Sequence, residues 1–128
     1  MSSSKVHIRT ERVTKPVAVV VELISTAIGD PEQAHELSKE LASLVQPEAV
    51  DRFVLDFRNV KSFSSTGFGA LVGFVLKVRK LGGQVFICNM DDFVRFGADI
   101  IRLGDYAPIF DDRRAALDHL AAEGTPGS

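Results

Sequence analysis

Three hydroxyl-bearing residues run directly into two glycines near the middle of the chain: Ser64, Ser65 and Thr66 precede Gly67 and Gly69. An amphipathic stretch follows them, so they stand at the start of a predicted helix. A hydroxyl there can accept a hydrogen bond from the unpaired amides of the first helical turn, and those amides with the helix dipole attract an anion. A phosphoryl group on such a hydroxyl would gain these contacts and add about −1.5 to −2 charges. The pattern suits receiving a phosphoryl group rather than catalysing a reaction.

A purely structural interpretation of the same segment also stands. The hydroxyls would then be helix caps, and the glycines would be small because the helix packs closely on a sheet. On the functional interpretation, Gly67 and Gly69 instead leave room for the backbone of another protein. From the residues alone both interpretations remain open.

Asp56, near the end of a predicted strand, raises the possibility of a receiver domain that takes a phosphoryl group on aspartate. Such a site needs further acidic residues to hold Mg²⁺, which prefers oxygen ligands. The first predicted strand ends in Glu11-Arg12 and the second has an isolated Glu22, and no lysine ends the last strand. We therefore expect a structural role for Asp56, with hydrogen bonds to backbone or loop groups.

The sequence does not contain the motifs that are typical of other catalytic sites or of metal sites. The glycines of residues 67–73 are spaced G-x-G-x-x-x-G with no following lysine, which fits neither a dinucleotide fingerprint nor a P-loop. His7, His35 and His119 lie on separate predicted elements, are expected to be exposed or at helix ends, and have no ligand-like spacing. Cys88 is the single cysteine and lies in a predicted buried strand, where it packs as a small hydrophobe. No metal site, cofactor or enzymatic activity is expected.

Length and composition describe one ordinary domain. The chain has 128 residues, 45% of them hydrophobic and 25% charged, with a net charge of −2. An acidic balance argues against a nucleic-acid-binding domain. No signal peptide is recognisable, and the apolar run at 67–76 is shorter than the roughly 20 residues that span a bilayer. We expect a single cytoplasmic domain over 1–128, with an ordered core of about 5–121, flexible ends at 1–4 and 123–128, and no membrane association.

Hydrophobic periodicity predicts a strand hairpin followed by alternating helices and strands. The hairpin has an edge strand from Val6 to Val13 and a buried strand at 17–23, joined by a turn at 14–16. Further strands are predicted at 53–57, 84–88 and 108–110. Helices are predicted from Asp30-Pro31 to Pro47, from 68 to 80, from Asp91 to about 101, and around 116–120. This order implies an α/β fold, a mixed sheet of four to five strands with about four helices.

The predicted core draws on every helix. It includes Phe93 and Phe96 under the third helix and Phe110 beneath the fourth. Exposure of Phe93 or Phe96 would instead indicate a partner-binding patch, because contiguous exposed apolar surface usually marks an interaction site.

Several segments together resemble the STAS domains, and in particular the bacterial anti-sigma factor antagonists. The strand V-L-D-F at 54–57 and S-S-T-G-F-G-A-L at 64–71 are similar to that family's core motif, D-S-[ST]-G-[LIFM]-G after a strand. The basic helix end, double glycine and strand at 79–89 match as well, as does I-I-R-L-G at 100–104 before P-I-F. Element order agrees over about 5–120, and the motifs lie within 53–110.

The resemblance implies a regulatory switch. In that family the unphosphorylated antagonist binds an anti-sigma factor that is also a serine kinase of the histidine-kinase-like ATPase type, which frees the sigma factor. Phosphorylation of the serine after the motif aspartate blocks binding until a serine phosphatase restores it. The position corresponds to Ser65, with Thr66 and Ser64 as less favoured acceptors. ATP and Mg²⁺ belong to the kinase, and the implied partner-binding residues of this chain are Ser64, Ser65, Thr66, Gly67, Phe68 and Gly69.

One position departs from the family pattern: Ser64 stands where the motif has aspartate. Three outcomes follow, in order of preference: Ser65 is phosphorylated by a partner adapted to serine, Ser64 or Thr66 is the acceptor, or phosphoregulation has been lost. The last outcome keeps an alternative function open, a STAS scaffold or ligand-sensing module without a phospho-switch.

Overall fold

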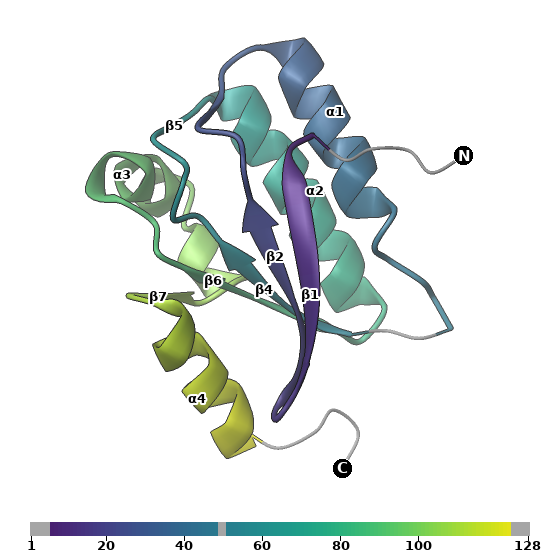
Figure 1. Ribbon diagram of the computed structural model, residues 1–128. Helices are drawn as coiled ribbons and strands as arrows, with labels where there is room; N and C mark the ends of the chain where they lie inside the picture. Colours follow the sequence, from purple (N-terminus) through teal and green to yellow (C-terminus); the bar gives the residue numbers. More distant parts are fainter. Residues whose placement is uncertain (1–5, 49–50, 124–128) are drawn as a thin grey trace.

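A mixed five-stranded sheet with four helices forms the molecule in the computed structural model, which describes residues 6–48 and 51–123 (Figure 1). The predicted fold class is confirmed. The main elements are β1 (Ile8–Thr14), β2 (Val17–Leu23), α1 (Pro31–Ala42), β4 (Arg52–Asp56), α2 (Ser65–Lys80), β6 (Gln84–Cys88), α3 (Asp92–Ile100), β7 (Ile109–Phe110) and α4 (Arg113–Glu123). The predicted flexible ends fall outside the described residues, except that Glu123 is the last residue of α4.

Three short elements have no counterpart in the sequence prediction. They are β3 (Ala27–Ile28), β5 (Ser62–Phe63) and a 3-10 helix at Leu103–Asp105. The two strands pair in parallel as a separate small sheet, with Ile28 opposite Phe63. Neither strand stands out as an apolar run in the sequence, so their pairing with each other is what reveals them.

The main sheet has the strand order β1-β2-β4-β6-β7. β1 pairs antiparallel with β2 across a hairpin whose turn is Lys15-Pro16, as predicted, and the Lys15–Pro16 peptide bond is cis. The pairs β2–β4, β4–β6 and β6–β7 are all parallel. Because β4 is central and covered on both faces, all five of its residues are buried, which explains the apolar run of its middle residues 53–55 between two buried charged residues.

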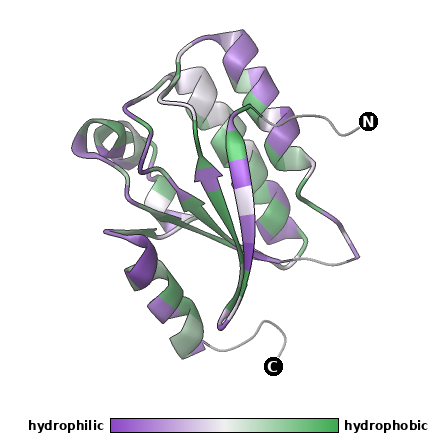
Figure 2. Cartoon of the chain, in the orientation of Figure 1, coloured by the Kyte–Doolittle hydropathy of each residue, from purple (hydrophilic) through white to green (hydrophobic). Residues whose placement is uncertain are grey.

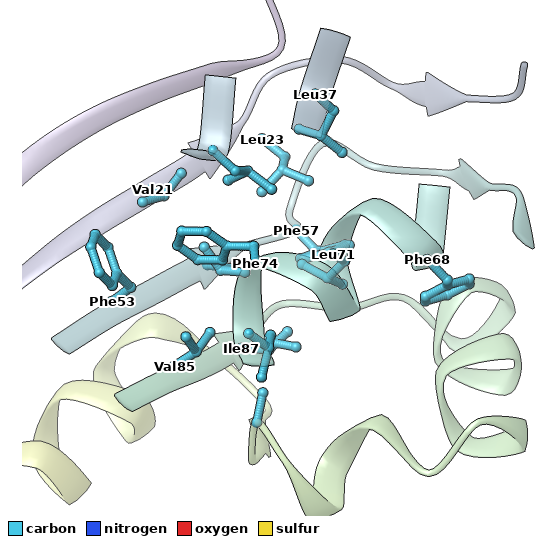
Figure 3. Packing of buried hydrophobic residues seen from close by; sticks show 14 of the residues in the cluster. Val21, Leu23, Leu37, Phe53, Phe57, Phe68, Leu71, Phe74, Val85 and Ile87 are labelled. Atoms are coloured by element: carbon cyan, nitrogen blue, oxygen red, sulfur yellow. The ribbon is translucent and has the colours of Figure 1, made fainter. Parts of the chain in front are cut away.

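Two apolar layers lie on opposite faces of this sheet. On one face α1, α2 and α3 pack against inward side chains such as Val85 and Ile87 (Figure 3). In that layer the rings of Phe53 and Phe74 meet edge to face at 5.3 Å between centroids. On the other face α4 covers a smaller cluster with Leu120 at its centre. Figure 2 shows the central strands mainly in the hydrophobic colour, as their burial requires.

Arg52 is a buried cation that ties α4 to the sheet. It is 1% exposed, and its Nη1 donates to the carbonyl oxygen of Leu120 at 3.2 Å, while Nη2 donates to that of Val17 at 3.1 Å. These bonds to carbonyl oxygens offset part of the cost of burying a guanidinium. Sequence reasoning missed this residue because an arginine at a strand start is normally exposed.

Helix boundaries follow their caps. Asp30 accepts a hydrogen bond from the Gln33 amide at 2.8 Å, and Pro31 is the first residue of α1, as predicted. The helix ends at Ala42, so Leu44 and Val45, predicted within it, follow its end and pack on the core from there. In α2, Leu76 is 47% exposed, because Phe74, Val75 and Val78 form the buried stripe of that half.

Candidate functional site

The hydroxyl segment is held in place by the small β3–β5 sheet. The amide of Lys61 donates to the carbonyl oxygen of Thr26 at 2.7 Å, and the amide of Ser64 donates to that of Ile28 at 2.8 Å. These bonds fix the chain on both sides of β5. The direction in which α2 starts is therefore set by β3, which lies more than thirty residues earlier in the sequence.

Ser64 is the N-cap of α2. Its φ and ψ are −80° and 171°, and its Oγ accepts a hydrogen bond from the amide of Gly67 at 3.2 Å. The same Oγ lies 2.9 Å from Oγ1 of Thr66. Both hydroxyls are thus engaged in local hydrogen bonds at the helix start.

Ser65 is the first residue of α2 and is exposed. Within the described part of the chain, no hydrogen bond involves its hydroxyl. The first turn of α2 contains no acidic residue, so no charge of its own opposes an anion there. Of the three candidate acceptors, Ser65 therefore presents its hydroxyl most freely, beside the amide groups and positive dipole end of a sixteen-residue helix.

The two glycines of the motif have different surroundings. Gly67 is buried, and a Cβ added there would lie 3.1 Å from Cγ2 of Ile28 and 3.3 Å from the Phe63 ring. The expectation that Gly67 leaves room for a partner backbone is wrong, since β3 and β5 occupy that space. Gly69 is exposed with nothing within 4 Å of an added Cβ, so it does leave an open approach from outside.

Phe68 points inward from the first turn and connects the motif to α3. It is 7% exposed, and its ring meets that of Phe63 edge to face at 5.0 Å between centroids. On its other side, a Cβ added at Gly97 of α3 would lie only 2.9 Å from Cε2 of Phe68. Gly97 thus lets α3 lie directly against the start of α2. Phe68, predicted to bind a partner, supports that surface from beneath.

Large apolar side chains are exposed on the outer side of α3. Phe93 is 73% exposed, Phe96 69% and Ile100 67%, so the prediction that the two phenylalanines are core residues is wrong. Val94 and Ala98 face the core in their place. The sequence contained a hint, because 93, 96 and 100 form one helical stripe and 94 and 98 form another. The exposed stripe matches the alternative reading, a partner-binding patch.

Asp56 is structural, as predicted. It is fully buried at the end of β4 and accepts hydrogen bonds from the Arg58 amide at 2.9 Å, Asn89 Nδ2 at 3.0 Å and Arg113 Nη2 at 3.0 Å. A carboxylate enclosed in this way cannot take a phosphoryl group from solution, which agrees with rejecting the receiver reading. Cys88 beside it is also buried, and burial together with the charge of Asp56 raises the pKa of its thiol to about 12.

His7 differs from the expectation that the histidines are exposed or at helix ends. It is 6% exposed, with Nδ1 2.6 Å from Ser25 Oγ and Nε2 3.0 Å from Glu36 Oε1. These contacts join the start of β1 to α1. His35 and His119 are exposed on α1 and α4, as expected.

Within residues 6–48 and 51–123, neither a cluster of metal ligands nor a membrane-spanning helix is found. No group of three or more potential histidine, cysteine, aspartate or glutamate ligands is arranged to hold a metal ion there. Nor does any helix in these ranges have the length and apolar character needed to cross a membrane.

Comparison with known proteins places this chain in a family. Residues 12–116 match the STAS domain model, so the chain belongs to the STAS domain family, as its motifs predicted. Among curated proteins, an anti-sigma F factor antagonist of Paenibacillus polymyxa is 23% identical over 91 residues, which covers 71% of this chain and 78% of that protein.

Two solved structures show the same fold. An anti-sigma-factor antagonist (STAS) domain protein from Planctomyces limnophilus superposes with a TM-score of 0.77 at 14% identity, covering 89% of this chain and 97% of that one. The Bacillus cell fate determinant SpoIIAA, solved in its phosphorylated form, gives 0.66 at 19% identity, covering 88% and 98%.

Proposed function

We propose that this protein is a phosphorylation-controlled anti-sigma factor antagonist. In its unphosphorylated form it binds an anti-sigma factor that is also a serine kinase of the histidine-kinase-like ATPase type, and this binding releases the sigma factor. Phosphorylation of Ser65 blocks binding, and a serine phosphatase restores it. The family match and the antagonist relatives support this assignment. The observation that carries it is the exposed, unengaged Ser65 hydroxyl at the start of α2.

The role is regulatory and non-enzymatic, in the cytoplasm, and this chain needs no cofactor because ATP and Mg²⁺ are bound by the kinase. Nucleic acid and membranes are not partners. The chemistry required of this protein is to present one hydroxyl and a docking surface.

Replacement of the motif aspartate by Ser64 is compatible with this role. Serine and aspartate are comparable N-cap residues, and Ser64 makes the capping bond to the Gly67 amide. The local helix start is thereby kept while the fixed negative charge beside Ser65 is lost. A kinase that recognises this chain would have to orient Ser65 without that carboxylate.

The α3 stripe extends the proposed docking surface. Phe93, Phe96 and Ile100 expose apolar area on a helix that touches the first turn of α2 through Gly97 and Phe68. A partner that covers both Ser65 and this stripe would bury the apolar side chains as its main source of affinity. Ser64, Thr66 and Gly69 contribute the rest of the contact, with Gly67 and Phe68 supporting it from inside.

A phosphoryl group at Ser65 would oppose such docking without any movement of this domain. It adds about −1.5 to −2 charges at a surface that must be desolvated on binding. Burying an unmatched dianion costs several kcal/mol, and about 3 kcal/mol already weakens binding more than a hundredfold.

The first test maps phosphorylation by mass spectrometry on the protein isolated from its native cells, with a phosphatase-treated control. Phosphate on Ser65 supports the proposal, phosphate on Ser64 or Thr66 moves the acceptor, and a fully covered but unmodified peptide across growth conditions contradicts the switch. The second test measures capture of the anti-sigma factor kinase by immobilised variants. Ser65→Glu and Ser65→Asp should abolish capture, Ser65→Ala should retain it, and Ser38→Glu on exposed α1 should behave as wild type.

The alternative function is a STAS scaffold or ligand-sensing module without phospho-switching. The absence of the motif aspartate at Ser64 is the observation that favours it. A scaffold would capture its partners equally well with all three Ser65 substitutions, which separates the two functions in the same experiment.

A further inference from the structure

An open cavity of about 390 Å³ lies at the opposite end of α2 from Ser65. It is lined by residues of the last turn of α2, the start of β6, the end of the 3-10 helix with the segment that follows it, and α4. Its volume falls in the range of small-molecule sites, about 300–1,000 Å³. The sixteen residues of α2, at about 1.5 Å each, place roughly 22 Å between its ends, so a protein docked at Ser65 would leave the cavity open.

Three aromatic rings are among the groups that line the cavity, those of Tyr106, Phe86 and His119. The rings of Phe86 and His119 lie 5.6 Å apart between centroids. Tyr106 is 45% exposed and the side chain of His119 42%, whereas Phe86 is 3% exposed. Exposed rings such as those of Tyr106 and His119 favour contact with a flat aromatic ligand.

The carboxylates around the cavity are already engaged. Asp105 Oδ2 accepts from Arg102 Nε at 2.8 Å. Glu123 Oε2 lies 3.0 Å from His119 Nε2. Both carboxylates therefore already have a hydrogen-bond partner, and neither forms an ion pair with Arg79 among the described residues.

Arg79 is the cation that lines this cavity without a carboxylate partner among the described residues. Its Nη1 donates to the carbonyl oxygen of Tyr106 at 2.8 Å, and its guanidinium carbon lies 5.8 Å from the centre of the Tyr106 ring. This bond uses one of the five N–H donors of the Arg79 guanidinium and fixes the position of that group. A guanidinium held in this way is suited to a carboxylate, which it can bind through two parallel hydrogen bonds.

We propose that this cavity is a binding site for a small planar aromatic carboxylate. The carboxylate group pairs with Arg79, and the ring packs against the exposed rings of Tyr106 and His119. The site is independent of Ser65 phosphorylation and gives this STAS domain a ligand-binding function beyond partner capture.

The test is a titration of the full-length, isotope-labelled protein followed by NMR chemical shifts, with benzoate as the probe. A ligand of this size should bind with a dissociation constant of about 1–5 mM and shift the signals of Gly83, Gln84 and Tyr106. Benzamide, which keeps the ring without the charge, and acetate, which keeps the charge without the ring, should each bind at least about tenfold more weakly.

Two variants complete the test, and the spectrum of each reports its folding directly. Arg79→Gln should weaken benzoate binding at least about fivefold, since it removes the charged donor. Lys80→Gln removes an adjacent positive charge outside the cavity lining and should change the affinity less than about twofold. Acetate binding as well as benzoate, benzamide binding equally, absence of shifts, or equal effects of the two substitutions would each overturn the proposal.

Discussion

Alanine substitutions at Gly67 and Gly69 should change stability in opposite directions, although the two residues lie two positions apart on α2. In a helix, alanine is favoured over glycine by about 0.5–1 kcal/mol because it loses less backbone entropy. At Gly69 an added Cβ meets nothing within 4 Å. Gly69→Ala should therefore raise the free energy of unfolding by about 0.5–1 kcal/mol.

At Gly67 the same gain in helix propensity is outweighed by the steric overlap of the added Cβ with its neighbours. The added Cβ lies 3.1 Å from Ile28 Cγ2 and 3.3 Å from two atoms of the Phe63 ring. Neither neighbour can move easily, because Ile28 is 1% exposed and the Phe63 ring is in edge-to-face contact with both Phe57 and Phe68. Overpacking of this kind costs about 1–3 kcal/mol. Gly67→Ala should lower the free energy of unfolding by about 0.5–2 kcal/mol after the helix gain is subtracted.

The assay is urea unfolding followed by circular dichroism, with thermal unfolding alongside. The two variants should differ by about 1–3 kcal/mol, and each kcal/mol should move the melting temperature by about 3–5 °C in a chain of this length. Gly73→Ala serves as a control, since its added Cβ also meets nothing within 4 Å. If Gly67→Ala stabilises the protein as much as Gly69→Ala does, the packing of β3 and β5 against α2 described above is wrong.

Two further predictions concern the buried groups at the end of the sheet. The pKa of Cys88 is raised in the folded state by burial and by the charge of Asp56, to about 12, whereas an unfolded thiol titrates near about 8.5. The unfolded chain thus releases this proton first as pH rises, so stability should fall above about pH 8.5, by up to about 1.4 kcal/mol per pH unit, and level off above about pH 12. Cys88→Ala should lack this part of the slope in urea unfolding measured at several alkaline pH values, and an identical slope would show that another group is responsible. Arg113→Met removes the cation 3.0 Å from buried Asp56 and should cost about 2–3 kcal/mol, reduced from the value for a fully buried pair because Arg113 is one-third exposed. The neighbouring Arg114→Met, at an 89% exposed side chain, should stay within about 0.5 kcal/mol of wild type, and equal losses for both would refute a special role for the Asp56 pair.

Predictions from the sequence were correct where the local pattern of a segment and its tertiary contacts favour the same structure. The apolar run of β4, the capping of α1 by Asp30 and the start of α2 at the hydroxyl segment were all predictable. Each depends on residues within a few positions of one another, through periodicity or a cap. The STAS resemblance was recognisable for a similar reason, because each of the segments that carry it is a short run of consecutive residues.

The predictions of burial that were wrong or missing have a common cause, because they depend on contacts between segments that are distant in the sequence. Helix α3 has two apolar stripes, and only the position of α2 decides that Val94 faces inward while Phe93 and Phe96 face solvent. His7 and Arg52 are polar residues whose burial depends on Glu36 and on two carbonyl oxygens far along the chain. No local pattern encodes such partners.

The sequence by itself determined the class of fold, a helix that follows the hydroxyl segment and the family to which the chain belongs. These follow from propensity, capping and periodicity, which act over one or two turns of backbone. Only the tertiary structure decided that Gly67 serves internal packing while Gly69 stays open, that Gly97 of α3 lies against Phe68 of α2, and that Arg79 and Tyr106 line one cavity with His119. The physical reason is that burial and surface accessibility depend on which distant elements the sheet brings together, and strand order is a property of the whole chain.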